Sequence, residues 1–229
     1  MADRRNWTAT ALLMLCLIPA NPSIAAPHAG AGPVKVPHGT TRCNVGAWVS
    51  FLADAPIPVR ARPTAAARLL GELPIAPETE GDFSAVEFDI IEARPGWLKI
   101  DHATDPVELN EEGEAVPARP LPAGEGWIPD DAAQIGIQSA LGYADPDAAS
   151  PLLLDIGDDW VTDMGWTGAI RGCSGDWLLV DYQIERARTP TGALVDLPEA
   201  ERPRGTAWFR GICANQKTTC DMASVDRRL

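Results

Sequence analysis

The sequence predicts an all-β protein that contains two tandem copies of one small unit, and two observations carry this prediction. The first is an internal repeat, because the stretch Ile90–Ile100 returns about eighty residues later as 170–180, with Trp97 recurring as Trp177. The second is composition, since 21 prolines and 20 glycines accompany 45% hydrophobic residues. Such a chain is too hydrophobic for a disordered protein and too rich in turn residues for a helical one. Many short strands joined by turns satisfy both observations.

Three further landmarks recur in the same order as the central repeat. They are an arm that contains proline, a turn signal that ends in glycine, and a tryptophan near the end of each copy. The two copies of the arm are identical at six of ten positions. Four landmarks in one order indicate a duplicated unit. The copies of the arm, the turn and the closing tryptophan are 61–70 and 144–153, 110–113 and 189–192, and Trp127 and Trp208.

Residues 1–25 have the layout of a secretory signal peptide. A basic start at Arg4 and Arg5 precedes an apolar stretch and a small-residue cleavage site that ends at Ala25. We therefore expect an exported protein, periplasmic or extracellular, and the arginine pair leaves Sec and twin-arginine export both open. No stretch predicts a transmembrane segment in the mature chain. Residues 26–42, rich in proline, glycine, histidine and alanine, predict a disordered linker.

The strands of the first unit are expected within residues 43–134. Pro56, Pro58 and Pro63 restrict the second strand to an edge or an irregular arm, because proline cannot donate to a ladder. An acidic loop is expected over 74–83, and the two strands that follow it form a hairpin around a glycine turn. The expected strands are 43–52, 57–61, 68–73, 85–91 and 97–101.

The second unit is expected over 135–213, and residues 214–229 form a C-terminal tail. Each unit carries about 25 residues between its Trp-led strand and its closing strand, which predicts an extended hairpin or loop in both. In the first unit this segment is acidic over 105–114, but it lacks the Asp-x-Asp-x-Asp-Gly spacing of a calcium loop. The aspartates between 155 and 163 lack it too. A solvated loop is the simpler interpretation of both, and we expect no metal site.

The closing segment Gly126–Pro129 reads Gly-Trp-Ile-Pro, and the same unit opens with the arm Pro58–Pro63, Pro-Val-Arg-Ala-Arg-Pro. These motifs resemble the bacterial SH3-like domain family, in which such an arm opens a small barrel and Gly-Trp-(Val/Ile)-Pro precedes its last short strand. The resemblance covers about residues 44–135 well. It covers 141–212 less well, because the second closing motif, Ala207–Arg210, lacks the proline and the first glycine. The resemblance implies two tandem SH3-like small barrels.

Removal of the signal peptide leaves four cysteines, an even number in an exported chain, so two disulfides are expected. Three connectivities are possible. We favour Cys213 with Cys220, which close a short loop, and Cys43 with Cys173 then follows. The latter bridge ties the two units together. A zinc site is the poorer alternative, since there is no Cys-x-x-Cys motif.

The net charge of −13 at pH 7 limits the partners of the protein. An acidic chain repels polyanions, which argues against binding to nucleic acid or to anionic lipid. Neutral or cationic partners are favoured.

Residues suited to catalysis are scarce. His102 is the only histidine outside the linker, and it is interpreted as a surface residue rather than a general base. No catalytic domain remains once the two repeats are counted, so we expect no enzyme activity and no cofactor. Three functions stay open: a binding module for a cell-wall peptide or a periplasmic protein, a structural or assembly subunit of an envelope complex, and an unrecognised hydrolase. We favour the binding module and leave the oligomeric state open.

Peptide-binding SH3-like barrels use a groove of aromatic side chains flanked by acidic loops. We place the recognition surface on the first unit, because it keeps the proline of the closing motif. Such a rim favours peptides with free amines, such as peptidoglycan peptides, or an envelope protein. The aromatic candidates are Trp48, Trp97 and Trp127, and the acidic rim consists of Glu108, Glu111 and Glu112.

Overall fold

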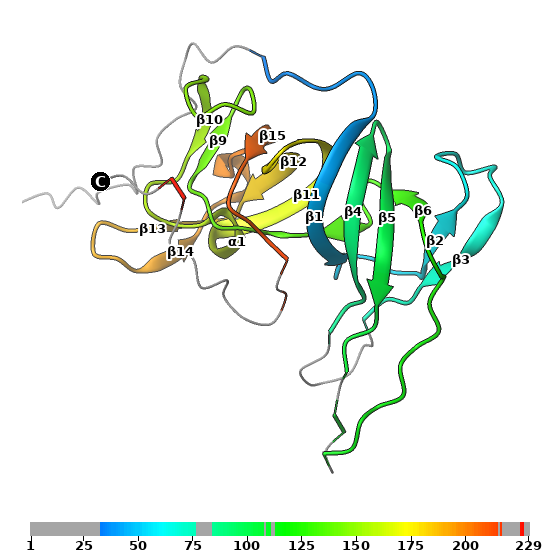
Figure 1. Ribbon diagram of the computed structural model, residues 1–229. Coiled ribbons are helices and arrows are strands. Elements are labelled where there is room, and N and C mark those ends of the chain that lie inside the picture. Colours follow the sequence, from blue (N-terminus) through cyan, green and yellow to red (C-terminus); the bar gives the residue numbers. More distant parts are fainter. Residues whose placement is uncertain are drawn as a thin grey trace, which may run out of the picture.

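The computed structural model describes residues 33–76, 84–107, 109–110, 113–214, 216 and 225–226. Its chain is all-β, as predicted (Figure 1). Within those ranges, helix is limited to α1 (Val161–Met164) and the 3-10 turn η1 (Glu199–Glu201). The expected signal peptide and most of the expected tail lie outside the described residues.

The first sheet holds seven strands in the order β3-β2-β6-β5-β4-β1-β7. Its neighbouring strands are antiparallel, and the hairpin of β4 and β5 pairs Ile90 with Ile100. All five strands expected from the sequence are present in it, with small shifts at their ends. The strands are β1 (Thr41–Val49), β2 (Ile57–Arg60), β3 (Leu69–Leu73), β4 (Glu87–Arg94), β5 (Trp97–Thr104), β6 (Gly126–Pro129) and β7 (Ala133–Gln134).

The second sheet holds five strands in the order β10-β9-β15-β12-β11. Its hairpin pairs Ile170 with Val180, the repeat positions of Ile90 and Ile100. Two more strands, β8 and β16, pair with each other as β1 pairs with β7. The strands are β8 (Gly136–Ile137), β9 (Leu141–Tyr143), β10 (Leu152–Asp155), β11 (Gly165–Ser174), β12 (Trp177–Ile184), β15 (Arg204–Phe209) and β16 (Ile212–Cys213).

The two sheets share one strand order, which agrees with the duplication seen in the sequence. Replacing β3, β2, β6, β5 and β4 by β10, β9, β15, β12 and β11 converts five adjacent strands of the first sheet into the second, while β1 and β7 extend the first sheet alone. The expectation of closed barrels needs correction, because no ladder joins the outer strands of either sheet in the described part of the chain. Instead β11, an outer strand of the second sheet, packs against β1 and β4 of the first. Both sheets are therefore open.

Glycine occupies the turn of each central hairpin because the backbone there is left-handed. Gly96 lies between β4 and β5 with φ of 81°, and Gly175 lies between β11 and β12 with φ of 59°. A side chain with a Cβ atom is strained at such angles. The glycine breaks predicted from the repeat are thus required by turn geometry.

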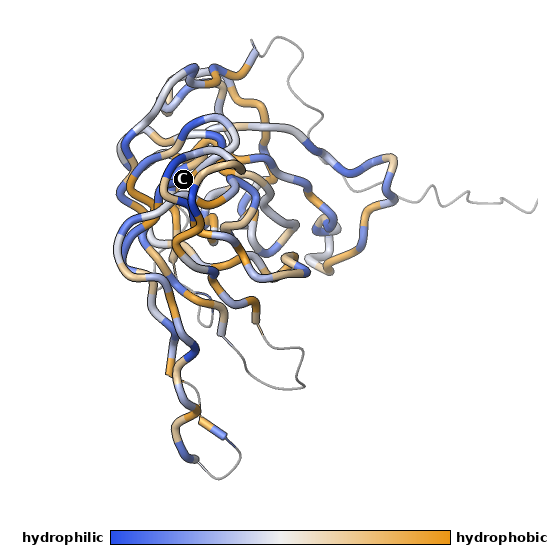
Figure 2. Tube along the Cα trace, turned by 90° about the vertical axis from the view of Figure 1, so that its right-hand side faces the viewer, coloured by the Kyte–Doolittle hydropathy of each residue, from blue (hydrophilic) through white to orange (hydrophobic). Residues whose placement is uncertain are grey.

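The predicted turn signals in the two insertions form the same turn. The backbone N–H of Gly113 donates to the carbonyl of Asn110 over 2.9 Å, and that of Gly192 donates to Thr189 over 2.8 Å. In the second insertion the turn belongs to a hairpin of β13 (Arg186–Arg188) and β14 (Leu194–Asp196). The first insertion leaves the sheet after β5 and returns at β6, and it projects away from the body in both views (Figures 1 and 2). Each unit therefore carries the extended excursion that its sequence predicted.

One hydrophobic core runs through both sheets. Its members include Leu98 and Ile128 from the first sheet and Ile170 and Phe209 from the second, all close to fully buried. Buried positions alternate with partly exposed ones along β2 and β6, and hydrophobic and hydrophilic residues intermix along the trace (Figure 2). Because the core is shared, each sheet covers apolar surface that the other leaves open.

Two covalent or ionic links also join the sheets. Cys43 on β1 and Cys173 on β11 form a disulfide with a Cα–Cα distance of 5.3 Å, which confirms the predicted pairing. Arg171 on β11 binds Asp130, which follows β6, with an N–O distance of 2.9 Å. Cys213 is also disulfide-bonded. Its expected partner, Cys220, lies outside the described residues.

Candidate functional site

The two closing tryptophans occupy the same place in their sheets. Trp127 on β6 lies between Arg60 on β2 and Lys99 on β5. Trp208 on β15 lies between Tyr143 on β9 and Leu179 on β12. The repeat makes these two sets of neighbours equivalent, so Arg60, Trp127 and Lys99 mark the same face of the first sheet that Tyr143, Trp208 and Leu179 mark on the second. We call these the first and the second tryptophan face.

The second tryptophan face is covered by the segment that precedes β1. The indole nitrogen of Trp208 donates to the backbone carbonyl of Lys35 over 3.0 Å, and the backbone N–H of Lys35 donates to Ala144 over 2.9 Å. The Lys35 ammonium lies 2.7 Å from a carboxylate oxygen of Asp145. Val34 packs with Trp208, whose exposed fraction falls to 2%. A piece of the chain itself thus occupies this face.

Prolines at both ends favour an extended form of this covering segment. Pro33 and Pro37 fix φ near the polyproline II value, which lowers the entropy lost when the segment is held against a surface. Pro37 packs directly on Gly172 of β11, where an added Cβ would lie only 3.0 Å from the proline Cγ. In Figure 1 the segment runs past β9 and β10 before it enters β1. The prediction of a disordered linker over 26–42 is therefore corrected for residues 33–42.

In the described part of the chain, no segment is hydrogen-bonded to Trp127 as Lys35 is to Trp208. Trp97 and Trp127 are both half-buried there, and Leu69 at the end of the same face is 47% exposed. Lys99 forms ion pairs with Glu125 at 2.5 Å and with Glu92 at 3.6 Å. The hydrogen bond to Glu125 is the main reason why the pKa of Lys99 is raised. The aromatic surface is thus bordered by charged groups of both signs.

The structure brings together only part of the predicted recognition surface. Trp97 and Trp127 share the first tryptophan face, but Trp48 is 5% exposed and belongs to the core. A ring buried to that extent cannot line an open groove. The predicted acidic rim, Glu108, Glu111 and Glu112, lies outside the described residues. The side chains that flank Trp127 in the sheet are instead the cations Arg60 and Lys99.

A cluster of buried polar groups lies at the end of the second tryptophan face. The Asp226 carboxylate, with a side chain 1% exposed, accepts hydrogen bonds from Ser139, from Tyr143 at 3.0 Å and from Arg210 Nε at 2.8 Å. Burial, and next the charge of Asp226, raise the pKa of Tyr143 to about 12. The Arg210 guanidinium also lies 5.5 Å from the ring centre of Trp177. Arg210 stands where the first closing motif has proline, so the difference between the two closing motifs has a structural use.

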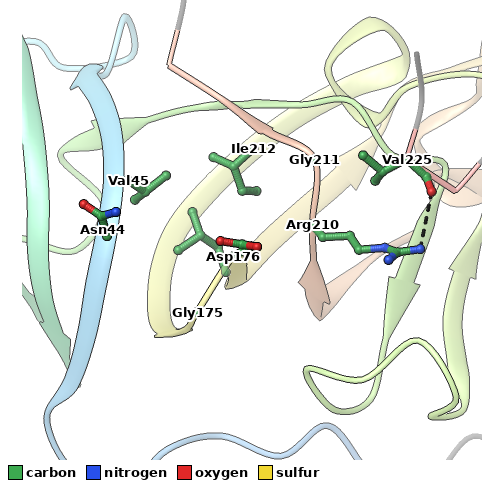
Figure 3. Close-up of a pocket in the computed structure, with 9 residues that line it drawn as sticks. Asn44, Val45, Gly175, Asp176, Arg210, Gly211, Ile212 and Val225 are labelled. Carbon is green, nitrogen blue, oxygen red and sulfur yellow. Dashed lines mark hydrogen bonds between the residues drawn. The ribbon is translucent and has the colours of Figure 1, made fainter. Parts of the chain in front are cut away.

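Two cavities adjoin these faces. A cavity of about 370 Å³ is bordered by Arg210, Asp176, Asn44 and Val225, and Figure 3 shows the Arg210 side chain reaching from it towards the carbonyl of Val225. Another, of about 380 Å³, lies where both sheets meet. Its wall includes Leu52, which is 73% exposed, and Trp166, which is 37% exposed. Asp54 and Asp131 also line it.

The acidic stretches and the histidine singled out in the sequence have ordinary partners. Asp105 binds Arg119; burial opposes ionisation, but the hydrogen bonds and charge of Arg119 outweigh it and lower the pKa of Asp105. Asp159 pairs with Arg188. Exposed His102 contacts Asp89 over 3.2 Å. Within the described ranges, no three His, Cys, Asp or Glu side chains gather as metal ligands do.

Sequence reasoning missed the two residues that cover the second tryptophan face, Val34 and Lys35. One signal pointed to them: Pro33–Pro37 holds two valines around Lys35 between two prolines, and proline-flanked segments are typical of extended peptides that dock on aromatic surfaces. The general composition of 26–42 hid this local pattern.

Comparison with known proteins assigns no relative to this chain, because no protein-family model, no curated protein and no solved structure matches it. In the part of the chain that the structure describes, none of the helices has the length and apolarity to cross a membrane.

Proposed function

We propose that this protein is an exported, non-catalytic binding module, made of two SH3-like units, which recognises an extended peptide segment through its first tryptophan face. The peptide belongs to the cell wall or to another protein of the envelope. The Cys43–Cys173 disulfide is compatible with export, because such bonds persist in oxidising compartments. The shared order of five strands supports two units of one kind.

One observation carries this proposal: the second tryptophan face already holds a peptide, Pro33–Pro37, through a hydrogen bond from Trp208 to a backbone carbonyl. A bond to backbone and an apolar contact are the features with which extended peptides are commonly bound. Trp127 has the same place in the first sheet and carries the same indole N–H group. The second face is occupied within the chain, so recognition of a partner is assigned to the first.

The test uses the mature chain from residue 26 and a phage-displayed library of random peptides, with purified sacculi as a second probe. We expect capture of peptides by the wild type, and a loss of about thirtyfold in affinity for Trp127→Ala, as for an aromatic anchor worth 2 kcal/mol. Trp166→Ala is the matched control, because Trp166 lies 37% exposed on the second sheet. Retention of affinity by Trp127→Ala would falsify the proposal.

A structural or assembly role is the second candidate, and the cavity between the sheets favours it. Leu52, 73% exposed, lines this cavity with Trp166, and its chain neighbour Phe51 is 43% exposed. Clustered apolar side chains at a surface mark contact sites. On this view the wild type self-associates with rising concentration in sedimentation velocity, and Leu52→Asp stays monomeric. Val107→Asp is the control, since Val107 is 78% exposed near the start of the first insertion and does not line this cavity. A wild type that remains monomeric rejects this candidate.

A further inference from the structure

We propose that the ligand of the first tryptophan face is an extended, acidic segment of a partner protein, with an aspartate or glutamate at the place that Lys35 takes on the second face. This inference rests on the proposed function and adds the chemistry of the ligand. It follows from the repeat, because the second face with its bound segment is a template for the first.

The arms beside the two faces have the same backbone hydrogen bonds. Ala61 donates to Arg68 over 3.0 Å, as Ala144 donates to Pro151 over 2.9 Å. Thr64 donates to the carbonyl of Arg62 over 2.8 Å, as Asp147 donates to that of Asp145 over 2.8 Å. Arg62 therefore occupies the position of Asp145 in its arm.

This correspondence reverses the charge that a ligand meets. Asp145 binds the ammonium of Lys35 at 2.7 Å, and the first arm has arginine at that place. The exposed side chain of Arg62 forms no hydrogen bond or ion pair with another described residue. Arg60, whose Nη1 donates to the carbonyl of Ala67 over 2.9 Å, stands where the second face has Tyr143. Two guanidinium groups favour a carboxylate, which they can bind through paired N–H groups, and disfavour lysine. The charge that the first arm presents to a ligand is thus opposite to that of the second arm.

Of the two ends of the Pro33–Pro37 segment, only the Val34 end has an equivalent binding surface on the first face. Pro37 rests on Gly172, but the repeat position of Gly172 is Glu92, whose carboxylate lies 3.6 Å from the Lys99 ammonium. That ion pair fills the place of the second proline. The Val34 end differs, because Leu69 and Trp127 leave apolar surface there. The ligand is accordingly an apolar residue followed by an acidic one, and a proline after them is not required.

The same charges exclude the Pro33–Pro37 segment of a second copy as the ligand. That segment would bring the Lys35 ammonium to Arg62, where two cations repel each other. A segment of a different protein with the opposite charge is favoured instead. An ordinary polypeptide is the closest match to the bound segment, since the contact uses backbone N–H and C=O groups.

The experiment compares two fluorescent peptides by anisotropy: residues 31–38 of this chain, Ala-Gly-Pro-Val-Lys-Val-Pro-His, and the same peptide with glutamate for lysine. We expect the glutamate peptide to bind the mature wild type about tenfold more tightly, a difference that high salt removes. Arg62→Asp should reverse the preference. Arg94→Asp, the same charge change at another exposed position, should leave it unchanged.

Each result separates the two proposals. An equal or tighter affinity of the wild type for the lysine peptide overturns the acidic ligand, as does an unchanged preference in Arg62→Asp. Failure of both peptides to bind, or binding of sacculi alone, overturns it too. In all these cases, capture of library peptides that depends on Trp127 leaves the proposed function standing. Capture that does not depend on Trp127 removes both.

Discussion

The indole nitrogen of Trp208 donates a hydrogen bond to the backbone carbonyl of Lys35, 3.0 Å away, across a sequence separation of 173 residues. The two residues belong to opposite ends of the chain. Their contact brings Val34 against the cluster of Tyr143, Leu179 and Trp208, so the second sheet is completed by a segment that precedes the first. The stability of the second sheet should therefore depend on residues outside its own half of the sequence.

Substitution of Val34 tests this dependence. Val34 is half-buried against Trp208, so Val34→Ser should lower the free energy of unfolding by about 1 kcal/mol, part of the value of a fully buried valine. Val36→Ser is the matched control, because Val36 is 44% exposed and should tolerate serine. Urea unfolding of the mature protein measures both. Equal midpoints for the two variants would contradict the packing of Val34.

Loss of the Cys43–Cys173 bridge should destabilise the protein strongly. The bond spans a sequence separation of 130 residues, and closing so long a loop removes much of the entropy of the unfolded chain. The double variant Cys43→Ala, Cys173→Ala should lose about 3–5 kcal/mol of unfolding free energy. Peptide mapping of the oxidised wild type checks the pairing independently. A variant as stable as the wild type would mean that the core alone holds the sheets together.

Much of the architecture follows from the repeat. Trp97 and Trp177 open equivalent strands, and Gly96 and Gly175 form equivalent turns, because each landmark depends on local backbone needs that the sequence displays. The pairing of Cys43 with Cys173 followed from the short loop assigned to the other two cysteines. These features could be predicted because they depend on residues that are close in the sequence, or on the number and spacing of the cysteines.

The surroundings of Trp127 could not be predicted in the same way. Its neighbours Arg60 and Lys99 come from β2 and β5, which flank β6 only because of the strand order. Register between distant strands depends on the whole sheet, so the sequence pattern directed attention to nearby glutamates instead. Trp48 was misjudged for a related reason, since β11 packs on β1 and no local pattern announces that contact.

Arg171 should hold the two sheets together through Asp130. The Asp130 side chain is 9% exposed, and it accepts hydrogen bonds from Arg171 at 2.9 Å and from the backbone of Gly96 at 3.1 Å. Arg171→Met leaves this carboxylate without its cation and should cost about 1–3 kcal/mol, less than a fully buried pair because Arg171 is 40% exposed. Arg188→Met, at the more exposed pair with Asp159, should change stability by at most about 0.5 kcal/mol.

The loss of unfolding free energy caused by Arg171→Met, here called the deficit, should also depend on pH. Burial raises the pKa of Asp130 above its ordinary value of 3.8, although Arg171 opposes this. A carboxyl group with a raised pKa in the folded state stabilises the fold most when protonated, and that stability falls as pH rises through the raised value. Without the arginine the pKa rises further, so the deficit should shrink as pH falls from 7 towards about 4. A deficit that stays constant over this range would show that Asp130 is not the group left unpaired.

The two tyrosines should resist ionisation in the folded protein. Burial raises the pKa of Tyr182, and burial with the charge of Asp226 raises that of Tyr143 to about 12, above the ordinary 10.0. The folded protein should therefore show little tyrosinate absorbance at pH 10, whereas the chain in urea is half ionised there. Because the folded state keeps protons that the unfolded state releases, this contribution to stability is complete below pH 10 and is lost as pH rises towards 12.

Asp226→Asn in a Tyr182→Phe background isolates Tyr143 and should lower its pKa, since it removes the neighbouring negative charge. Ionisation of the folded parent at the ordinary value would mean that Tyr143 is not held against Asp226.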